Sequence, residues 1–239
     1  MHQGDLDGIK GVYLINAVDE VTQFQVVCAV ERISEAYLLP VLAALMDAFP
    51  FVIRGFNSER EACPWGTTGR SIYALWVFMP SGYINYKVAK LLEKLRIEQT
   101  KSRARQTNDN ALAESENAST VRKHLGYSHI PQRFAGQVNA FTVKALSPYL
   151  NFHRPCHFPT EHTDKKGRIR KRYRYQDMMT PFEKMKSLPD VADVKKPGIT
   201  LTGLDAIATK QSDNEAAHQL NEARTALFQF INKSQQHAA

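Results

Sequence analysis

The stretch GVYLINAVDEVTQFQVVCAVE, residues 11–31, decides how the fold begins. It contains two runs rich in β-branched and aromatic residues, at 11–19 and 22–31, and a short polar step at Asp19 and Glu20 separates them. Side chains of these types favour strands, and a short polar connection between two such runs is typical of an antiparallel pair. The sequence therefore predicts that a β-hairpin opens the fold.

Helix and strand patterns alternate after this hairpin. Ser34 is a candidate N-cap for residues 36–49, in which apolar side chains recur at helical spacing. The short apolar run 51–56 predicts a buried strand, the amphipathic run 84–95 a second helix, and residues 96–100 another strand. This order of elements predicts an α/β protein.

The C-terminal half is expected to be helical, with one exception. Helical patterns cover residues 110–124 and 131–146, and apolar residues at regular spacing between 216 and 231 predict a terminal helix. Between these helices, turn residues at 164–167 precede a segment in which basic and aromatic residues alternate. We expect that segment to form a hairpin or arm.

Residues 60–82 do not fit the elements around them. The stretch places CPWGTTGR next to the apolar run IYALWVFMP, between a strand and a helix that a few residues would otherwise connect. Apolar β-prone segments of this kind promote aggregation when they are exposed. We expect residues from about 60 to 82 to be an insertion that protrudes from the core or docks on it as an extra hairpin.

Composition favours a soluble globular protein with a polyanionic partner. The 239 residues are 43% hydrophobic and 23% charged, and the formal net charge is +7. The longest apolar run, at 72–79, is far shorter than the roughly 20 residues that span a bilayer, and no secretory signal pattern is found. Three widely spaced cysteines suit free thiols in a reducing compartment. We therefore expect a cytoplasmic protein that does not enter membranes.

Five stretches carry a resemblance to a known family: VYLINAVDEVTQF at 12–24, GYINYKVAKLLEKL at 82–95, NALAE at 110–114, NFHRPCHFP at 151–159 and KKGRIRKRYRYQDMMTPFEK at 165–184. With them the chain resembles bacterial insertion-sequence transposases that carry an integrase catalytic core, in the DDE, retroviral-integrase-like superfamily. The resemblance covers nearly the whole chain apart from residues 59–82.

The resemblance implies an N-terminally truncated ribonuclease-H-like fold, which is a mixed sheet with flanking helices, followed by a basic C-terminal arm and a helical tail. In domain terms, it implies a catalytic core over residues 1–146, interrupted by the insertion, and a basic C-terminal region with a hairpin and terminal helices over 147–239. The family cuts and joins DNA ends, so DNA is the implied partner and self-association into a homo-oligomer is expected.

The family's chemistry depends on three acidic residues, Asp, Asp and Glu, that hold two Mg²⁺ or Mn²⁺ ions at a DNA phosphodiester. Such hard ions prefer oxygen ligands, and a pair of them stabilises both the attacking and the leaving oxygen. Glu114, which ends the NALAE motif, matches the third acidic residue. Without the resemblance, Glu114 is a solvated glutamate that the helix dipole favours in a first turn.

The other two carboxylates are poorly matched. Glu59 stands where the family has its second Asp, and it is one methylene longer, so it is either a misplaced ligand or a surface charge in a loop. The first Asp would precede His2, so we expect Met1 to start the protein inside the fold, and Asp5, Asp7 and Asp19 match turn positions instead. Catalysis by this copy is therefore expected to be impaired, and whether it is an enzyme stays open.

Basic residues in two regions are candidates for DNA contact, because cationic groups interleaved with aromatic ones suit a phosphate track with stacking surfaces. The alternative is a solvated, solubilising surface. The candidates are Lys101, Arg103, Arg105, Arg122 and Lys123 around the Glu114 motif, and Lys165, Lys166, Arg168, Arg170, Lys171, Arg172 and Arg174 in the arm.

A zinc site is not indicated by the nearby His153, Cys156, His157 and His162, since their spacing fits no standard pattern of paired ligands. Three functions stay open. The first is an integrase-type transposase core acting in DNA integration and transposition; the second is a non-catalytic DNA-binding remnant of one. A third, an RNA-processing nuclease of the same fold, would need an intact acidic cluster and a recognition module that the sequence does not offer.

Overall fold

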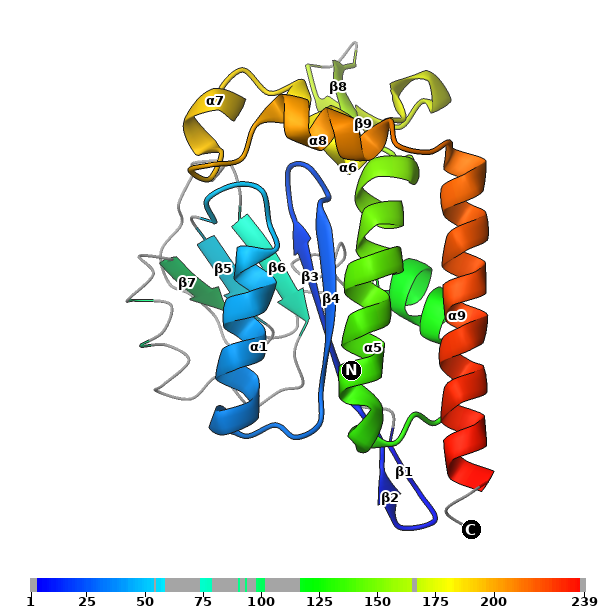
Figure 1. Ribbon diagram of the computed structural model, residues 1–239. Coiled ribbons are helices and arrows are strands. Elements are labelled where there is room, and N and C mark those ends of the chain that lie inside the picture. Colours follow the sequence, from blue (N-terminus) through cyan, green and yellow to red (C-terminus); the bar gives the residue numbers. More distant parts are fainter. Residues whose placement is uncertain are drawn as a thin grey trace.

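The structure is a computed structural model that describes residues 4–53, 55–58, 74–78, 90, 93, 98–101, 117–164 and 167–236 (Figure 1). The strands are β1 Asp5–Leu6, β2 Ile9–Lys10, β3 Tyr13–Asp19, β4 Gln25–Val30, β5 Gly55–Ser58, β6 Ala74–Phe78, β7 Glu98–Lys101, β8 Thr160–Thr163 and β9 Ile169–Arg172. The helices are α1 Glu35–Asp47, η2 Asn117–Arg122, α4 Lys123–Leu125, η3 Gln132–Phe134, α5 Ala135–Phe141, η4 Thr142–Leu146, η5 Tyr149–His153, η6 Tyr175–Asp177, α6 Pro181–Lys186, α7 Val191–Val194, α8 Leu201–Ala208 and α9 Asp213–Gln236.

A five-stranded mixed sheet forms the middle layer, with strand order β4-β3-β6-β5-β7. β3 is antiparallel to both β4 and β6, whereas β5 is parallel to both β6 and β7. The predicted opening hairpin is confirmed, with Tyr13 opposite Val30 and Val18 opposite Gln25. The predicted α/β class is confirmed as well, in the sense that helices and a mixed sheet are combined in one fold.

The strands β3 and β4 are almost continuously apolar because both faces of the sheet are covered. On one face, Ile15 and Val26 pack against α1, whose buried residues are Leu38, Leu42, Leu45 and Met46. Phe24, Phe49, Phe51 and Phe152 form an aromatic cluster in the same core, with Phe24 within 5.8, 5.9 and 6.2 Å of the other three ring centroids. The predicted helix after Ser34 is thus present, although the Ser34 side chain makes no capping hydrogen bond.

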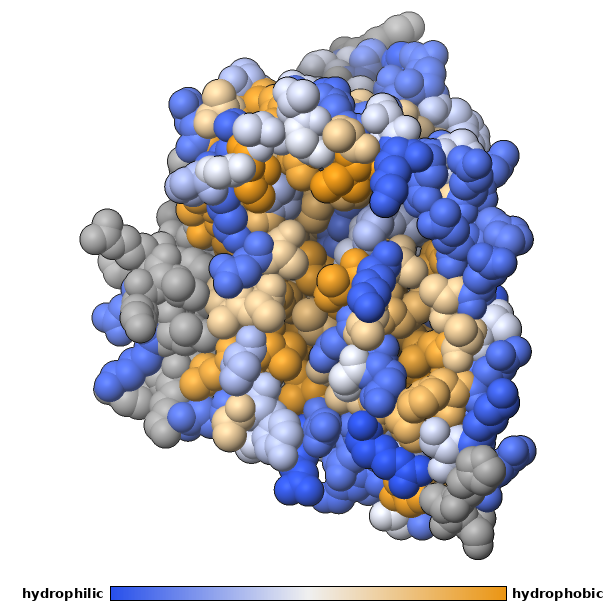
Figure 2. All heavy atoms as spheres, viewed as in Figure 1, coloured by the Kyte–Doolittle hydropathy of each residue, from blue (hydrophilic) through white to orange (hydrophobic). Residues whose placement is uncertain are grey.

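On the opposite face, Leu14 and Val27 pack against a second core of helical residues. The helical run from α5 through η5 and the long helix α9 lie side by side along the molecule and supply most of this core (Figure 1). Leu220, Leu227 and Ile231 of α9 are buried there, as their helical spacing predicts. Hydrophilic side chains cover the outer side of α9, at the right-hand edge of Figure 2.

The position of β6 corrects the expectation for residues 60–82. Ala74–Phe78 neither protrude nor dock as an extra hairpin, because β6 lies in the middle of the sheet, between β3 and β5. Strands inside a sheet that is covered on both faces are typically continuous apolar runs, and the sequence of β6 is ALWVF. The rest of the expected insertion, at 60–73 and 79–82, lies outside the described residues.

Two asparagines cover the edge of the sheet at β4, which is the terminal strand among the described residues. Asn139 accepts a hydrogen bond from the backbone N–H of Ala29 (2.6 Å) and donates one to its carbonyl (2.8 Å). Asn151 does the same to Gln25, at 2.7 and 2.8 Å. Both lie on the helical run from Ala135 to His153, in which η4 and η5 are π-helical. The amides satisfy backbone groups that an open strand edge leaves available for pairing with another chain.

The C-terminal residues contribute to both cores. Phe182 and Met185 of α6 pack with Phe49 and Phe51, whereas α9 packs on the other face. The boundary at residue 146 stays a prediction, because side chains from both sides of it share each core. None of the helices in the described ranges is both long and apolar enough to cross a membrane.

Candidate nucleic-acid interface

The basic segment after residue 164 forms one strand of a two-stranded antiparallel hairpin, β8–β9, which we call the arm. Gly167 closes its turn with a φ of +74°, a conformation that glycine adopts without a steric penalty. Asp164 orders the turn, because its Oδ1 accepts a hydrogen bond from the Arg168 N–H (3.0 Å) and its backbone carbonyl accepts one from the Gly167 N–H (3.0 Å). The hairpin predicted from the turn residues at 164–167 is therefore present.

The base of the arm is fastened to the body of the protein. Cys156 and Met179 form an isolated antiparallel bridge, with N···O distances of 2.8 and 3.3 Å between their backbones. Above this bridge, the Thr160 hydroxyl lies 3.2 Å from the Arg172 carbonyl and 3.4 Å from an Asp177 carboxylate oxygen. In Figure 1 the arm lies at the end of the molecule where the β3–β4 hairpin turns.

Exposed cationic groups line the arm. Arg168, Arg170, Lys171, Arg172 and Arg174 are all exposed. Arg170 donates from Nε to Asp164 Oδ2 at 3.2 Å, and 69% of its side chain remains accessible. An exposed pair of this kind contributes little to stability, so its main effect is to orient the guanidinium. Lys165 and Lys166, which belong to the same predicted set, lie outside the described residues.

Aromatic and apolar side chains stand among these cations in solvent. Tyr175 is 85% exposed and Tyr173 is 59% exposed. The Tyr175 ring contacts that of His157 edge-on, with 5.6 Å between centroids. Exposed aromatic rings beside arginines offer stacking surfaces for bases as well as cationic contacts for phosphates. The predicted alternation of basic and aromatic residues is thus largely presented to solvent.

The second predicted set of cations is only partly described. Arg122 and Lys123 are exposed where η2 passes into α4. Lys101 ends β7, and Arg103 and Arg105 lie outside the described residues. η2 is linked to the base of the arm, because Arg154 donates from Nη1 to the Thr120 hydroxyl at 2.9 Å.

That link belongs to a buried polar network that joins the helices to the sheet. Thr120 Oγ1 donates to Gln25 Oε1 (3.0 Å), and Gln25 Nε2 donates to Asn16 Oδ1 (2.7 Å). Asn16, Gln25 and Thr120 are almost fully buried. Buried polar groups must be paired, so the network fixes how η2 and Arg154 sit against β3 and β4. Sequence reasoning missed it because it joins residues that are far apart in the chain, such as Gln25 and Thr120, which are separated by 95 positions.

The predicted metal ligands Glu114 and Glu59 both lie outside the described residues. Since β5, β6 and β7 are parallel, their carboxyl ends at Ser58, Phe78 and Lys101 share one edge of the sheet. Among the described residues, no group of three or more His, Cys, Asp or Glu side chains is arranged to hold a metal ion. Mg²⁺ or Mn²⁺ binding by Glu114 and Glu59 stays a prediction.

Of the three acids that match turn positions in the family pattern, Asp7 lies in a turn, whereas Asp5 is in β1 and Asp19 is the last residue of β3. Asp5 and Asp7 are exposed in the small β1–β2 hairpin. Asp19 ends β3 opposite Leu75, near the amino end of β6 and away from the shared carboxyl ends. Its Oδ2 accepts from the Thr22 N–H (2.7 Å) and hydroxyl (2.6 Å), which shapes the β3–β4 turn. Burial raises the pKa of Asp19 to about 6, against the lowering effect of the two Thr22 hydrogen bonds.

The histidines near residue 156 have structural environments. His153 is buried, and its Nδ1 lies 2.9 Å from Asp213 Oδ1 at the start of α9, whereas His157 and His162 are exposed. Cys156 is a buried free thiol. Elsewhere, burial lowers the pKa of His124 to about 4, and neighbouring cations, led by Lys123, act in the same direction.

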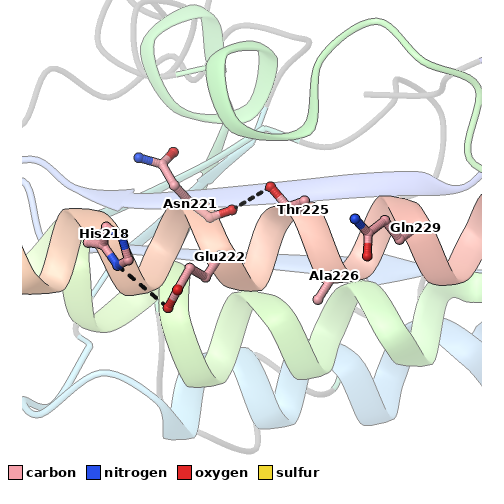
Figure 3. Close-up of a pocket in the computed structure, with 6 residues that line it drawn as sticks. All are labelled: His218, Asn221, Glu222, Thr225, Ala226 and Gln229. Carbon is pink, nitrogen blue, oxygen red and sulfur yellow. Dashed lines mark hydrogen bonds and ion pairs between the residues drawn. The ribbon is translucent and has the colours of Figure 1, made fainter.

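A surface hollow on α9 has no catalytic character. Figure 3 shows its six lining residues, all from one helix: His218, Asn221, Glu222, Thr225, Ala226 and Gln229. Three of the polar side chains interact within the helix: His218 Nδ1 lies 3.5 Å from Glu222 Oε2, and the Thr225 hydroxyl donates to the Asn221 carbonyl at 2.9 Å. The arm therefore remains the strongest candidate site among the described residues.

Comparison of the chain with protein-family models, with curated proteins and with solved structures finds no significant match.

Proposed function

We propose that this chain binds DNA through the arm and is derived from an insertion-sequence transposase with an integrase catalytic core, whose strand cleavage and transfer are impaired in this copy. The observation that carries the DNA-binding part is the arm itself. Five exposed cations of its described residues stand among exposed tyrosines, on a hairpin fastened at its base. Contacts between such cations and phosphates release counterions, which drives binding to any duplex.

The sheet supports the transposase part of the proposal. The resemblance implies a ribonuclease-H-like mixed sheet with flanking helices. A mixed sheet with α1 on one face and the α5–α9 layer on the other is compatible with that fold, and so is the basic hairpin that follows it. The transposase assignment itself rests on the sequence motifs.

Impaired catalysis follows from the carboxylates. Glu114 matches the family's motif, but Glu59 replaces an Asp and adds a methylene. A displacement of about 1 Å at a reacting centre reduces rates on the order of 100-fold. A remnant that binds DNA and performs no chemistry is the limiting case of this impairment.

DNA binding is tested by removing arm cations and measuring the salt dependence of affinity for a labelled duplex. Replacing Arg168, Arg170, Lys171 and Arg172 by Ala should weaken binding and reduce the slope of log K against log salt by about 0.9 for each phosphate contact removed, and so by at most about 3.6. A control with Lys10, Lys144, Lys210 and Lys233 replaced by Ala removes the same charge from exposed sites on other elements. Equal loss in both variants would refute binding through the arm.

Catalysis is tested separately with labelled DNA ends and Mg²⁺ or Mn²⁺. We expect no strand cleavage or joining by the unmodified chain and no change on Glu114→Gln, because one glutamate cannot hold two metal ions. Metal-dependent cleavage that Glu114→Gln abolishes would show that other acids complete the site. Self-association belongs to the same proposal, and light scattering after gel filtration measures it directly.

A further inference from the structure

The arm has two chemically different faces. Side chains alternate between the faces of a strand, so Arg170 and Arg172 lie on one face of β9 and Ile169 and Lys171 on the other. The register sets His162 opposite Arg170 and Thr160 opposite Arg172. We call the side that carries these four residues the arginine face. In the sequence, arginine also occupies positions 168 and 174, so it recurs at every second position across β9.

The dimensions of the arm suit one groove of duplex DNA. Its two strands lie about 4.8 Å apart, and its four-residue strands are about 13 Å long. A two-stranded ribbon with its side chains enters the major groove, which is about 12 Å wide and 8.5 Å deep, whereas the minor groove is only about 6 Å wide. All four residues of β9 are exposed, so no other element in the described part of the chain covers the ribbon on the β9 side.

The chemistry of the arginine face suits base edges. A guanidinium presents parallel N–H groups that match O6 and N7 of guanine in the major groove, whereas a lysine offers a point charge that suits phosphates. Asp164 accepts from Arg170 Nε and also from the turn N–H of Arg168. The carboxylate therefore holds Arg170 by its Nε and ties it to the turn of the arm.

We infer that the arm enters the major groove of duplex DNA as a two-stranded ribbon, with Arg170 and Arg172 directed at guanine edges and the Lys171 face directed away from the bases. The inference rests on the proposed DNA-binding function and adds to it the groove and the contact chemistry. Duplex RNA is a poor partner for this arrangement, because the major groove of an A-form helix is deep and narrow.

The test compares three probes: a G·C-rich DNA duplex of about 20 base pairs, the same duplex with 7-deazaguanine for guanine, and the RNA duplex of the same sequence. Replacing N7 removes one of the two acceptors from the major-groove edge and leaves the phosphates unchanged. The unmodified chain should bind the 7-deaza duplex on the order of 10-fold more weakly than the unmodified DNA, since a bidentate contact is worth about that factor or more. The RNA duplex should bind more weakly still.

Three variants assign the effect to the arginine face. Two variants keep the positive charge but remove the paired guanidinium N–H donors: Arg172→Lys, and the double variant Arg170→Lys with Arg172→Lys. For each of them, the difference in affinity between the two DNA duplexes should be smaller. Lys171→Gln, on the other face, should weaken binding to both duplexes and leave their ratio unchanged. Arg172→Lys leaves the Arg170–Asp164 contact intact, and thermal melting followed by circular dichroism shows whether each variant is folded.

Three outcomes overturn the inference and are distinct from failure of the proposed function. If the unmodified chain binds both DNA duplexes equally, or binds the RNA duplex as tightly as the DNA, the arm does not read the major groove although it still binds nucleic acid. If Lys171→Gln abolishes the difference between duplexes and the arginine variants do not, the faces are reversed. Absence of any DNA binding at low salt overturns the proposed function as well.

Discussion

Replacing Asp19 by Asn should remove a pH-dependent loss of stability. The Asp19 carboxyl is fully buried, and burial raises its pKa from 3.8 to about 6 in the folded protein. The folded state therefore binds this proton more tightly than the unfolded state does. The stability that Asp19 contributes is fully present below about pH 4 and is lost as the pH rises through about 6.

The expected size follows from the shift. A difference of about two pKa units between the folded and unfolded states corresponds to about 3 kcal/mol, because each unit is worth about 1.4 kcal/mol. Asn cannot ionise, and its amide oxygen can still accept from Thr22. The free energy of unfolding of Asp19→Asn, minus that of the unmodified chain, should therefore increase by about 3 kcal/mol between about pH 4 and about pH 8.

Urea unfolding followed by circular dichroism at several pH values measures this difference. An effect of the new amide that does not depend on pH shifts the whole difference curve by a constant. It therefore leaves the change of the difference with pH unaltered. Asp7→Asn is a matched control, since Asp7 is exposed and its φ of +52° is one that Asn tolerates. A flat difference curve for Asp19→Asn would refute the reasoning. A curve that falls with pH would mean that the Thr22 hydrogen bonds stabilise the carboxylate more than burial destabilises it.

Three further predictions concern buried groups. His124 has the opposite pH dependence: because its pKa is lowered in the folded protein, its contribution to the free energy of unfolding is lost as the pH falls from 6.5 to about 4. Over that range, the free energy of unfolding of His124→Leu, measured by the same urea assay, should decrease by about 3 kcal/mol less than that of the unmodified chain. Asn139→Ala and Asn151→Ala should each destabilise the fold by about 1–3 kcal/mol, since each leaves a backbone N–H and C=O of β4 unpaired, and hydrogen exchange at Ala29 or Gln25 should accelerate. Phe24→Ala should cost about 3–5 kcal/mol in urea unfolding because Phe24 contacts three other rings, and an equal loss in the half-exposed Phe230→Ala would contradict the packing argument.

Elements with a strong local pattern could be predicted from the sequence. The β3–β4 hairpin follows from two apolar runs around a short polar turn, and α9 follows from apolar residues at helical spacing. The arm follows from its turn residues, which the Asp164 and Gly167 geometry explains. In each case the backbone hydrogen bonds of the element join residues that are near in sequence, so a local pattern is enough to predict it.

Features that depend on distant partners were missed. The apolar run Ala74–Phe78 is recognisable as a strand, but its central place between β3 and β5 depends on pairings that no local pattern encodes. The network around Gln25 and the asparagine contacts to β4 join residues more than 90 positions apart. For the candidate site, the cations of the arm were predictable from the local run of basic and aromatic residues. Metal binding by Glu114 and Glu59 stays a prediction.

The two edge asparagines also dictate the pitch of the helix that carries them. Asn139 and Asn151 are twelve residues apart, and twelve residues of a regular α-helix make about three and a third turns, which would point the two side chains roughly 120° apart. Both nevertheless reach the same strand edge. An average near 4 residues per turn restores the phase, and the wider π-helical turns at Thr142–Leu146 and Tyr149–His153 move the helix toward that value. The hydrogen-bonding positions on β4 therefore match the average number of residues per turn in the adjacent helix. A single-residue insertion between the asparagines would rotate one amide away from β4.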